Sequence, residues 1–357
     1  MSQVYRIGIL APTSISLVNG GVRTQINQTT EALQRLGHEI VWVHSSEDLP
    51  AIDILHVFVA SSEHWGFLRQ FKTRSLIRNQ KKIPIVLSPI FFAPKKIGLT
   101  KFKLRIESIV GTFFSGISSE YGIKKQVCQL ADVILPNTQA EMNQIRQLFD
   151  IPQHHMHVIP NGVETRFLKA ESTEFMQRYG RKDFVLFVGQ ASSTRKNVLR
   201  LLEIAPSLDA PLVLIGDVGS DEYSQQCAEL IKRNNVLHLP TQEHHSTLLA
   251  SAYAAAKVFV LPSLFETPGI AAMEAALAGC AVVITKNGGT KEYFKEMASY
   301  IDPLDSTSLL TSINKQLHTK NEELKIQNTL LKKHIASHYS WDSVGKMTLA
   351  AHYSLLR

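Results

Sequence analysis

The sequence predicts an α/β protein with two doubly wound parallel sheets that follow one another along the chain. Short strand-like runs alternate with helical segments in both halves, which is the pattern of parallel sheets covered by helices on both faces. Most of these runs are apolar throughout, as expected for strands buried on both faces. The length of 357 residues is enough for two cores of about 150 residues each.

The first half of the chain contains a series of apolar runs that predict strands. Residues of high strand propensity fill these runs, and polar or glycine-containing segments separate them. The predicted strands are residues 4–10, 39–44, 54–59, 83–88, 133–136 and 157–159.

A second series of strands begins after a polar segment between Pro160 and Lys182, where we place the domain boundary. Its predicted strands are residues 184–188, 211–215, 236–240, 258–262 and 280–285. We therefore expect one domain at residues 1–165, a second at 166–340 and a terminal helix at 341–357. The apolar stripe of that helix packs either on the first domain or on the second.

Two carboxylates eight positions apart, Glu266 and Glu274, flank the predicted start of a helix. We expect Thr267 as the N-cap, Pro268 as the first helical residue and Gly279 as the C-terminal cap. The N–H groups from Pro268 through Gly269 to Ile270 then offer partial positive charge to an anion such as a diphosphate. The two carboxylates could accept hydrogen bonds from a sugar and a ribose, or they are two solvated acids on a surface helix.

The order of further motifs makes the first of these alternatives the better one. They comprise Pro160-Asn161-Gly162-Val163-Glu164, the segment from Phe187-Val188-Gly189 to Lys196-Asn197, Asn287-Gly288-Gly289-Thr290-Lys291-Glu292, and Tyr339-Ser340-Trp341. With the Glu266 and Glu274 pair, they resemble retaining glycosyltransferase family 4, among the group 1 glycosyl transferases of GT-B fold. The resemblance covers nearly the whole chain. It implies two Rossmann-like domains that face a cleft, with the acceptor on the first, the donor on the second and a last helix that often crosses back.

The resemblance also implies a reaction and its residues. A hexosyl unit passes with retention from a nucleotide diphosphate sugar, with a UDP-sugar favoured, to a hydroxyl acceptor of a cell-envelope glycan or lipid-linked saccharide. Lys196 neutralises the leaving diphosphate, Glu266 orients the donor sugar and Glu274 binds the ribose. The expected contacts are completed by Arg195, Gln190 and Glu292 in the second domain and by the Gly20-Gly21 loop in the first.

The chain departs from the family pattern at two places. Gln190 stands where the family usually has an arginine, and the loop Ser88-Pro89-Ile90-Phe91 lacks the histidine that many relatives place near the donor sugar. Arg195 either compensates for the missing charge or points to solvent. The alternatives to an active transferase are a transfer-deficient nucleotide-sugar-binding partner subunit, and a sugar-nucleotide epimerase or hydrolase of the same fold.

No cofactor and no metal are expected. Histidines are frequent at 154, 155 and 157 and at 244 and 245, but no acidic or cysteine residues adjoin them at metal-ligand spacing, so we interpret them as surface or linker residues. The lysine and the helix start would supply the positive charge at the diphosphate instead. Three widely spaced cysteines without paired spacing indicate a reducing compartment.

The basic residues are distributed unevenly. Residues 64–106 contain eleven lysines and arginines and no acidic residue, and between residues 91 and 105 the basic residues alternate with apolar ones. This pattern suits either a peripheral contact with an anionic membrane or a solvated face above core residues. No nucleic-acid recognition motif accompanies the charge, and no signal peptide or membrane span is recognisable. We expect a cytoplasmic protein, in the first alternative at the inner face of the membrane.

Overall fold

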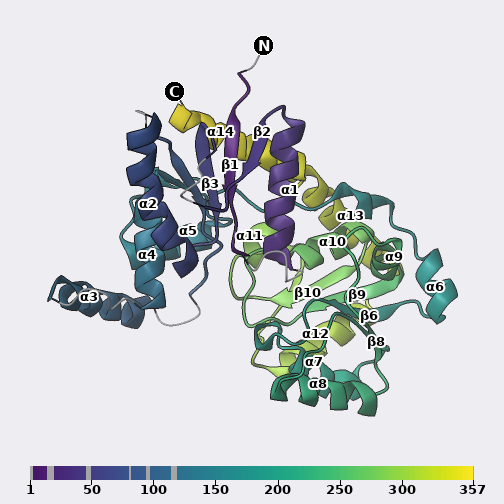
Figure 1. The fold of residues 1–357 in the computed structure, drawn as a ribbon. Coiled ribbons are helices and arrows are strands. Elements are labelled where there is room, and N and C mark those ends of the chain that lie inside the picture. Colours follow the sequence, from purple (N-terminus) through teal and green to yellow (C-terminus); the bar gives the residue numbers. More distant parts are fainter. Residues whose placement is uncertain are drawn as a thin grey trace. The chain divides into compact units, whose positions relative to one another are not determined.

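The structure is a computed structural model of the chain, and it describes residues 3–13, 20–45, 50–79, 82–93, 97–113 and 119–356. The chain divides into two compact units, shown as ribbons in Figure 1. Unit 1 comprises Met1–Gly162 and Trp341–Arg357, and unit 2 comprises Val163–Ser340. The chain therefore passes from unit 1 to unit 2 between residues 162 and 163, close to the predicted boundary.

Unit 1 contains a five-stranded sheet in the order β2-β1-β3-β4-β5, and all of its strand pairs are parallel. Its strands are β1 Arg6–Leu10, β2 Glu39–Trp42, β3 Ile54–Phe58, β4 Ile85–Ser88 and β5 Val133–Ile134. Its helices are α1 Gly21–Arg35, α2 Ser62–Asn79, α3 Ile97–Phe113, α4 Glu120–Leu130, α5 Gln139–Phe149 and α14 Trp341–Leu356. The doubly wound architecture predicted for the first half is confirmed.

The two faces of this sheet bury separate groups of side chains. On β3, Leu55 and Val57 pack into one apolar cluster, whereas Ile54 and Phe58 pack into another. The first cluster includes residues of α2 and α5, and the second includes residues of α1 and α14. Helices therefore cover both faces, which explains why the strands are apolar throughout.

Unit 2 contains a six-stranded parallel sheet in the order β11-β10-β9-β6-β7-β8. Its strands are β6 Phe184–Val188, β7 Leu212–Ile215, β8 Leu237–Leu239, β9 Ala256–Leu261, β10 Ala281–Thr285 and β11 Ser299–Ile301. Its helices are α6 Thr173–Tyr179, α7 Val198–Ile204, α8 Glu222–Arg233, α9 Thr247–Ala255, α10 Ile270–Ala278, α11 Thr290–Phe294, α12 Ser306–His318 and α13 Asn321–His338. All of the strands predicted for the second half are present.

Two strand predictions are corrected by the structure. The predicted strand at residues 157–159 is absent, because these residues make only single backbone hydrogen bonds to residues 134 and 136. The isolated bridge beside them joins Met156 to Ile134. The edge strand β11 was not predicted, since Ser299 and Tyr300 give its three residues little apolar character.

The terminal helix α14 packs in unit 1 and not in unit 2. It lies against α1 so closely that a Cβ atom on Gly345 would come within 2.7 Å of the Cβ of Ala32. At its start, the ring of buried Trp341 fills the space beside Gly162. Both ends of the chain thus belong to unit 1, and both are marked in Figure 1.

Among the described residues, every helix is either too short or too polar to serve as a membrane span.

Candidate functional site

The loop after β9 places Glu266 at the centre of a charged cluster in unit 2. Its side chain is only 7% exposed. Its Oε1 accepts hydrogen bonds from Lys196 Nζ at 2.6 Å, from Arg195 Nη1 at 3.1 Å and from Ser263 Oγ at 2.7 Å. All hydrogen bonds that Glu266 receives on its side chain from the described residues end on Oε1. Its Oε2 is therefore the oxygen that can accept a hydrogen bond from a ligand.

Arg195 and Lys196 lie on a short 3-10 helix, η4 Thr194–Lys196, in the loop that follows β6. The backbone ties this loop to the one that carries Glu266, because Leu264 donates its N–H to the carbonyl of Arg195 at 2.8 Å. Arg195 also donates to the carbonyl of Phe265 at 3.1 Å. Two adjacent strands, β6 and β9, thus deliver both cations and the carboxylate at the carboxyl edge of one sheet, where open α/β sheets bind ligands.

The charges of this cluster shift one another's proton affinities. Burial alone would raise the pKa of Glu266, but the charges of Lys196 and Arg195 and the hydrogen bonds to its carboxylate hold that pKa below its ordinary value. Burial lowers the pKa of Lys196, and Arg195 adds to this effect while Glu266 opposes it. Glu266 is thus an ionised carboxylate at neutral pH.

Helix α10 begins two residues later than predicted. Its N-cap is Gly269, and its first residue is Ile270, so Thr267 is not the N-cap and Pro268 is not the first helical residue. Gly269 adopts a left-handed backbone conformation directly before the first helical residue. Gly279 is the C-cap of the helix, as predicted, and is also left-handed. No side chain caps the first turn and no acidic residue lies in it, so its N–H groups can receive an anion.

Glu274 lies inside α10 with its carboxylate held on both sides. Its side chain is 6% exposed. His244 Nε2 lies 3.0 Å from Oε1, and the hydroxyl of Tyr253 donates to Oε2 at 2.8 Å. Because each carboxylate oxygen has two lone pairs, both oxygens retain the capacity for one more hydrogen bond. A vicinal diol is a ligand that would match this pair of acceptors.

The remaining predicted residues lie as follows. Gln190 is exposed directly after β6, and Glu292 is partly buried in the first turn of α11, next to the Gly288-Gly289 turn. Gly20 and Gly21 belong to unit 1, where they form the N-cap and the first residue of α1. The preceding Asn19 lies outside the described residues, as do Lys95 and Lys96 of the basic segment.

Two family models match the chain on either side of the unit boundary. Residues 19–167 match the model described as Glycosyltransferase Family 4, and residues 169–332 match the model described as Glycosyl transferases group 1. Only residues 1–18, 168 and 333–357 lie outside these matches. The chain belongs to the group 1 glycosyltransferases of family 4.

Solved structures of glycosyltransferases share the fold over the whole chain. The sucrose-phosphate synthase of Thermosynechococcus elongatus has a TM-score of 0.75 at 15% identity and covers 98% of this chain and 99% of its own. HepE of Anabaena, solved with UDP and glucose, has a TM-score of 0.71 at 16% identity and covers 98% of this chain and 100% of its own. The fold is therefore GT-B.

A curated relative also shares part of the sequence. An uncharacterized glycosyltransferase of Methanocaldococcus jannaschii, MJ1607, is 27% identical over 245 residues, which are 64% of this chain. The match spans 61% of the length of that relative.

The group 1 match covers every predicted site residue of unit 2, from Gln190 to Glu292, and the family 4 match covers Gly20 and Gly21 of unit 1. The position of Arg195 answers the question that the neutral residue Gln190 raised about the charge of this loop. Arg195 is not directed only to solvent, because it contacts the Glu266 carboxylate beside Lys196. This group 1 glycosyltransferase thus has a second cation, besides Lys196, in the loop that contains Gln190.

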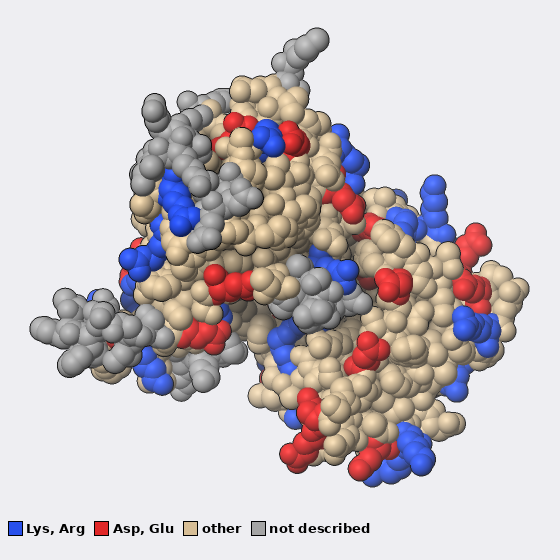
Figure 2. Space-filling model, viewed as in Figure 1, with Lys and Arg blue, Asp and Glu red and all other residues tan. Residues whose placement is uncertain are grey.

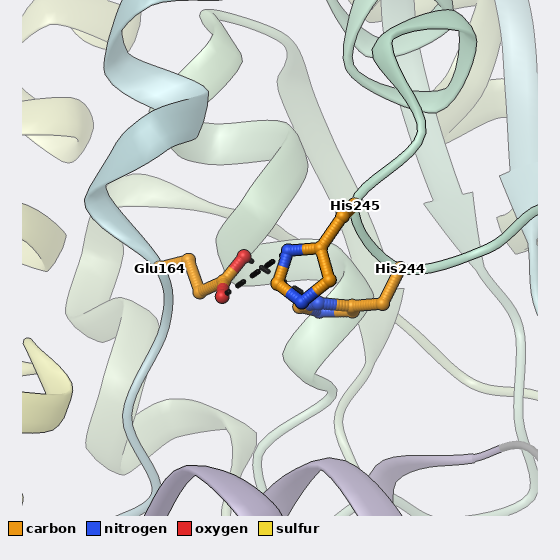
Figure 3. A group of neighbouring side chains, drawn as sticks. All are labelled: Glu164, His244 and His245. Atoms are coloured by element: carbon orange, nitrogen blue, oxygen red, sulfur yellow. Dashed lines mark ion pairs between the residues drawn. The ribbon is translucent and has the colours of Figure 1, made fainter. Parts of the chain in front are cut away.

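Sequence reasoning missed several residues of the site, and it was wrong about one. Ser263, Tyr253 and His244 bind the two glutamates, but they are distant in sequence or carry no motif. The expectation that His244 and His245 lack acidic partners is wrong. Figure 3 shows Glu164, from the start of unit 2, directed toward both imidazoles, and His244 also contacts Glu274. Only the fold brings residues 80 positions apart together.

Proposed function

We propose that this protein is a retaining glycosyltransferase that moves a hexosyl unit from a nucleotide diphosphate sugar to a hydroxyl acceptor. The observation that carries this proposal is the cluster around Glu266, in which a buried carboxylate and two cations share one edge of the unit 2 sheet. A site for a sugar diphosphate needs hydroxyl acceptors and anion donors side by side. This cluster provides both within hydrogen-bonding distance of one another.

Each group has a defined part in the proposed reaction. Glu266 Oε2 accepts a hydrogen bond from a hydroxyl of the donor sugar, and the carboxylate of Glu274 accepts hydrogen bonds from the two ribose hydroxyls. Lys196, Arg195 and the uncapped start of α10 stabilise the charge that develops on the leaving diphosphate. The departing diphosphate takes the proton of the acceptor hydroxyl on the same face, so the anomeric configuration is retained. Positive side chains and helix N–H groups replace a divalent metal in this proposal.

A UDP-sugar is the proposed donor. The structure of Anabaena HepE with UDP and glucose supports this choice, since that protein shares the fold of this chain. For the acceptor we propose a cell-envelope glycan or a lipid-linked saccharide, which helix α3 of unit 1 would meet at an anionic membrane surface.

Helix α3 supports a membrane contact through one face. Leu99, Phe102 and Ile106 are 60%, 62% and 46% exposed and lie at helical spacing, with exposed Lys103 and Arg105 beside them. Other parts of the basic segment do not contribute in this way. Phe91 and Leu104 are buried in the core, and Lys101 is paired with Asp150.

The distribution of surface charge limits the proposed membrane contact to helix α3. Figure 2 shows lysines and arginines at several places along the flank of unit 1 that carries α2 and α4, with acidic side chains between them. The basic bias of residues 64–106 is therefore partly offset by acids from other segments, such as Asp150 and Asp132. The exposed apolar stripe of α3 is the feature that distinguishes a membrane contact from a solvated face.

The experiment is nucleoside diphosphate release from UDP-, GDP- and ADP-sugars, with and without membrane lipid extract and without added Mg²⁺ or Mn²⁺. Lys196→Ala and Glu274→Ala should each reduce turnover about a hundredfold, because each removes a group that acts on the donor. Lys182→Ala and Glu174→Ala are matched controls, since both side chains are exposed in unit 2, and they should behave as wild type.

The outcome separates the proposal from its rivals. Release from one donor that increases with lipid acceptor and falls in both site variants supports a transferase. Tight UDP binding without release on any acceptor would instead indicate a transfer-deficient partner subunit. NMR of the anomeric carbon in the product tests retention, and an inverted product would refute the proposed mechanism.

A further inference from the structure

Glu164, His244 and His245 bring three metal-binding side chains together at one place in unit 2. Figure 3 shows the carboxylate facing both imidazole rings. One ligand atom from each residue lies within 4.8 Å of the others. The two histidines come from the loop between β8 and α9, and Glu164 comes from the segment before η3 Thr165–Lys169. Two neutral imidazoles and a carboxylate are a donor set that Zn²⁺ prefers.

The spacing within this group suits a shared ion better than direct hydrogen bonds. His244 Nδ1 lies 3.4 Å from Glu164 Oε2, and His245 Nδ1 lies 3.9 Å from Glu164 Oε1. A charge-assisted hydrogen bond would be shorter, at about 2.7–2.9 Å. Tetrahedral ligands that each lie about 2.1 Å from a zinc ion are about 3.4 Å apart. These two separations end on different oxygens of the Glu164 carboxylate, and Arg166 holds Oε2. Side-chain adjustments that bring Oε1 and both imidazoles to one ion would complete three ligand bonds and leave one position for water.

A second observation, independent of the donor set, concerns the other side of the His244 ring. Its Nε2 lies 3.0 Å from Oε1 of the buried Glu274. Histidines that bind a metal through one nitrogen commonly donate the N–H of the other to a carboxylate, which fixes the ring. When Nδ1 of His244 binds a metal, Nε2 must carry the proton, so this contact becomes a hydrogen bond donated to Glu274.

The residues around this group leave a path for an ion from solvent, and carboxylates among them partly balance the charge of the ion. His245 is 75% exposed on its side chain, so one ligand is open to solvent. Arg166 is the opposing feature, because its guanidinium pairs with Glu164 Oε2 at 2.7 Å and donates to the carbonyl of His244. Glu164 Oε1 faces His245, away from that pair, and Glu274 supplies a second negative charge behind His244.

We propose that Glu164, His244 and His245 bind a divalent transition-metal ion of the Zn²⁺ class. The ion would have no part in the transfer chemistry, which the proposed function assigns to Lys196 and Glu266. Instead it would hold the ring of His244, and through it the carboxylate of Glu274, in one orientation. The site does not depend on the proposed function, since its binding can be measured without donor or acceptor.

The test is metal binding by the purified full chain after it has been stripped with a chelator. Calorimetric titration with ZnCl₂ should show one saturable equivalent, and Co²⁺ should give the visible absorption of a four-coordinate ion. His245→Ala should weaken zinc binding at least tenfold. The matched control is His155→Ala, from the adjacent exposed pair His154 and His155, whose rings lie 4.4 Å apart. Among the described residues no carboxylate joins that pair in a metal-binding group.

Two further measurements keep the test decisive. Glu164→Gln removes the carboxylate charge without touching either histidine, and it should also weaken binding. Zinc should raise the thermal midpoint of the wild type but not of His245→Ala, because a ligand that binds only the folded state stabilises it. Absence of saturable binding, or equal losses in His245→Ala and His155→Ala, would overturn the proposal.

Discussion

Glu274 and Glu266 are carboxylates that the fold removes from water and supplies with different partners. Glu266 is bound by two cations and a hydroxyl, whereas Glu274 is bound by a hydroxyl and an imidazole. A buried carboxylate without such partners would cost several kcal/mol, so these contacts are needed to hold both side chains inside unit 2. Their remaining lone pairs are then available to a ligand in fixed directions.

The variant Tyr253→Phe tests whether the carboxylate of Glu274 must be held in position. The hydroxyl of Tyr253 donates a hydrogen bond to Oε2 of Glu274, and the tyrosine ring is fully buried. The variant therefore removes this hydrogen bond and leaves the packing of the ring almost unchanged. We expect the donor KM to rise about tenfold or more with kcat nearly unchanged, since the loss of one charge-assisted bond is worth about 1.5–3 kcal/mol. Steady-state kinetics and calorimetric UDP binding would measure this effect.

The control for this variant is Tyr179→Phe, whose ring packs against Phe175 away from the site. It should leave the donor KM as in wild type. Equal changes in both variants would mean that Tyr253 acts on stability alone and does not position Glu274.

The turn after β10 supports the loop that carries Glu266 through backbone hydrogen bonds. Gly289 donates its N–H to the carbonyl of Glu266 at 2.9 Å, and Glu266 donates its own to Asn287 at 3.1 Å. Gly288 makes this approach feasible, because a Cβ at this position would lie 1.9 Å from the carbonyl oxygen of Glu266. Its φ of +99° also favours glycine.

Gly288→Ala is therefore expected to displace Glu266 as well as to strain the turn. Gly279→Ala is the matched control, because its φ of +103° is similar but no atom lies within 4 Å of its added Cβ. We expect the control to lose about 1 kcal/mol of unfolding free energy with normal turnover. Gly288→Ala should lose more and should reduce kcat/KM at least tenfold, as measured by denaturant unfolding and UDP release. Identical behaviour of the two variants would contradict this account of the turn.

Helix α3 gives a second prediction at this scale. Phe102→Ser should reduce sedimentation with anionic phosphatidylglycerol vesicles roughly tenfold, because the exposed ring would no longer enter the interface. Folding should be unaffected, since the side chain is exposed. Ile326→Ser on α13 is the matched control, because Ile326 is also an exposed apolar residue on a helix. If wild-type protein does not bind these vesicles, α3 is a solvated face.

Unit 1 as a whole should be sensitive to acid, because it buries a pair of histidines. In unit 1, α14 brings His352 to His56 of β3, with 3.2 Å between Nε2 and Nδ1, and both side chains are fully buried. Burial lowers the pKa of His352 to about 3, and burial together with His352 lowers the pKa of His56 well below its ordinary value. Both histidines are therefore neutral in the folded unit at neutral pH.

The stability of unit 1 should consequently fall as the pH falls below about 6.5, because the unfolded chain binds protons that the folded unit excludes. Each histidine contributes a slope of about 1 kcal/mol per pH unit in this range. Denaturant unfolding between pH 7 and pH 5 would measure this slope. His352→Leu should flatten it, whereas His318→Gln, on an exposed histidine of unit 2, should leave it as in wild type. A wild-type slope that persists in His352→Leu would contradict the assignment.

The fold class, the family and the residues that carry its motifs could all be predicted from the amino-acid sequence. Apolar strands in regular alternation with helices specify two parallel sheets, because residues close in sequence set the local structure. The family motifs identify Glu266, Glu274 and Lys196 in the same way. Periodicity could not exclude the predicted strand at residues 157–159, and it could not reveal β11, because each segment is only three residues long.

Which of these residues contact one another depends on the folded chain. The strand order of unit 2 brings Tyr253 and His244 to Glu274. It also brings Arg195 and Ser263 to Glu266, and Glu164 to His244 and His245. The place of α14 in unit 1 was likewise open in the sequence, since its apolar stripe would have matched either unit. The local pattern of apolar residues determines whether a segment is a helix or a strand and which of its faces is buried. Which other element packs against that face depends on the packing of the whole chain.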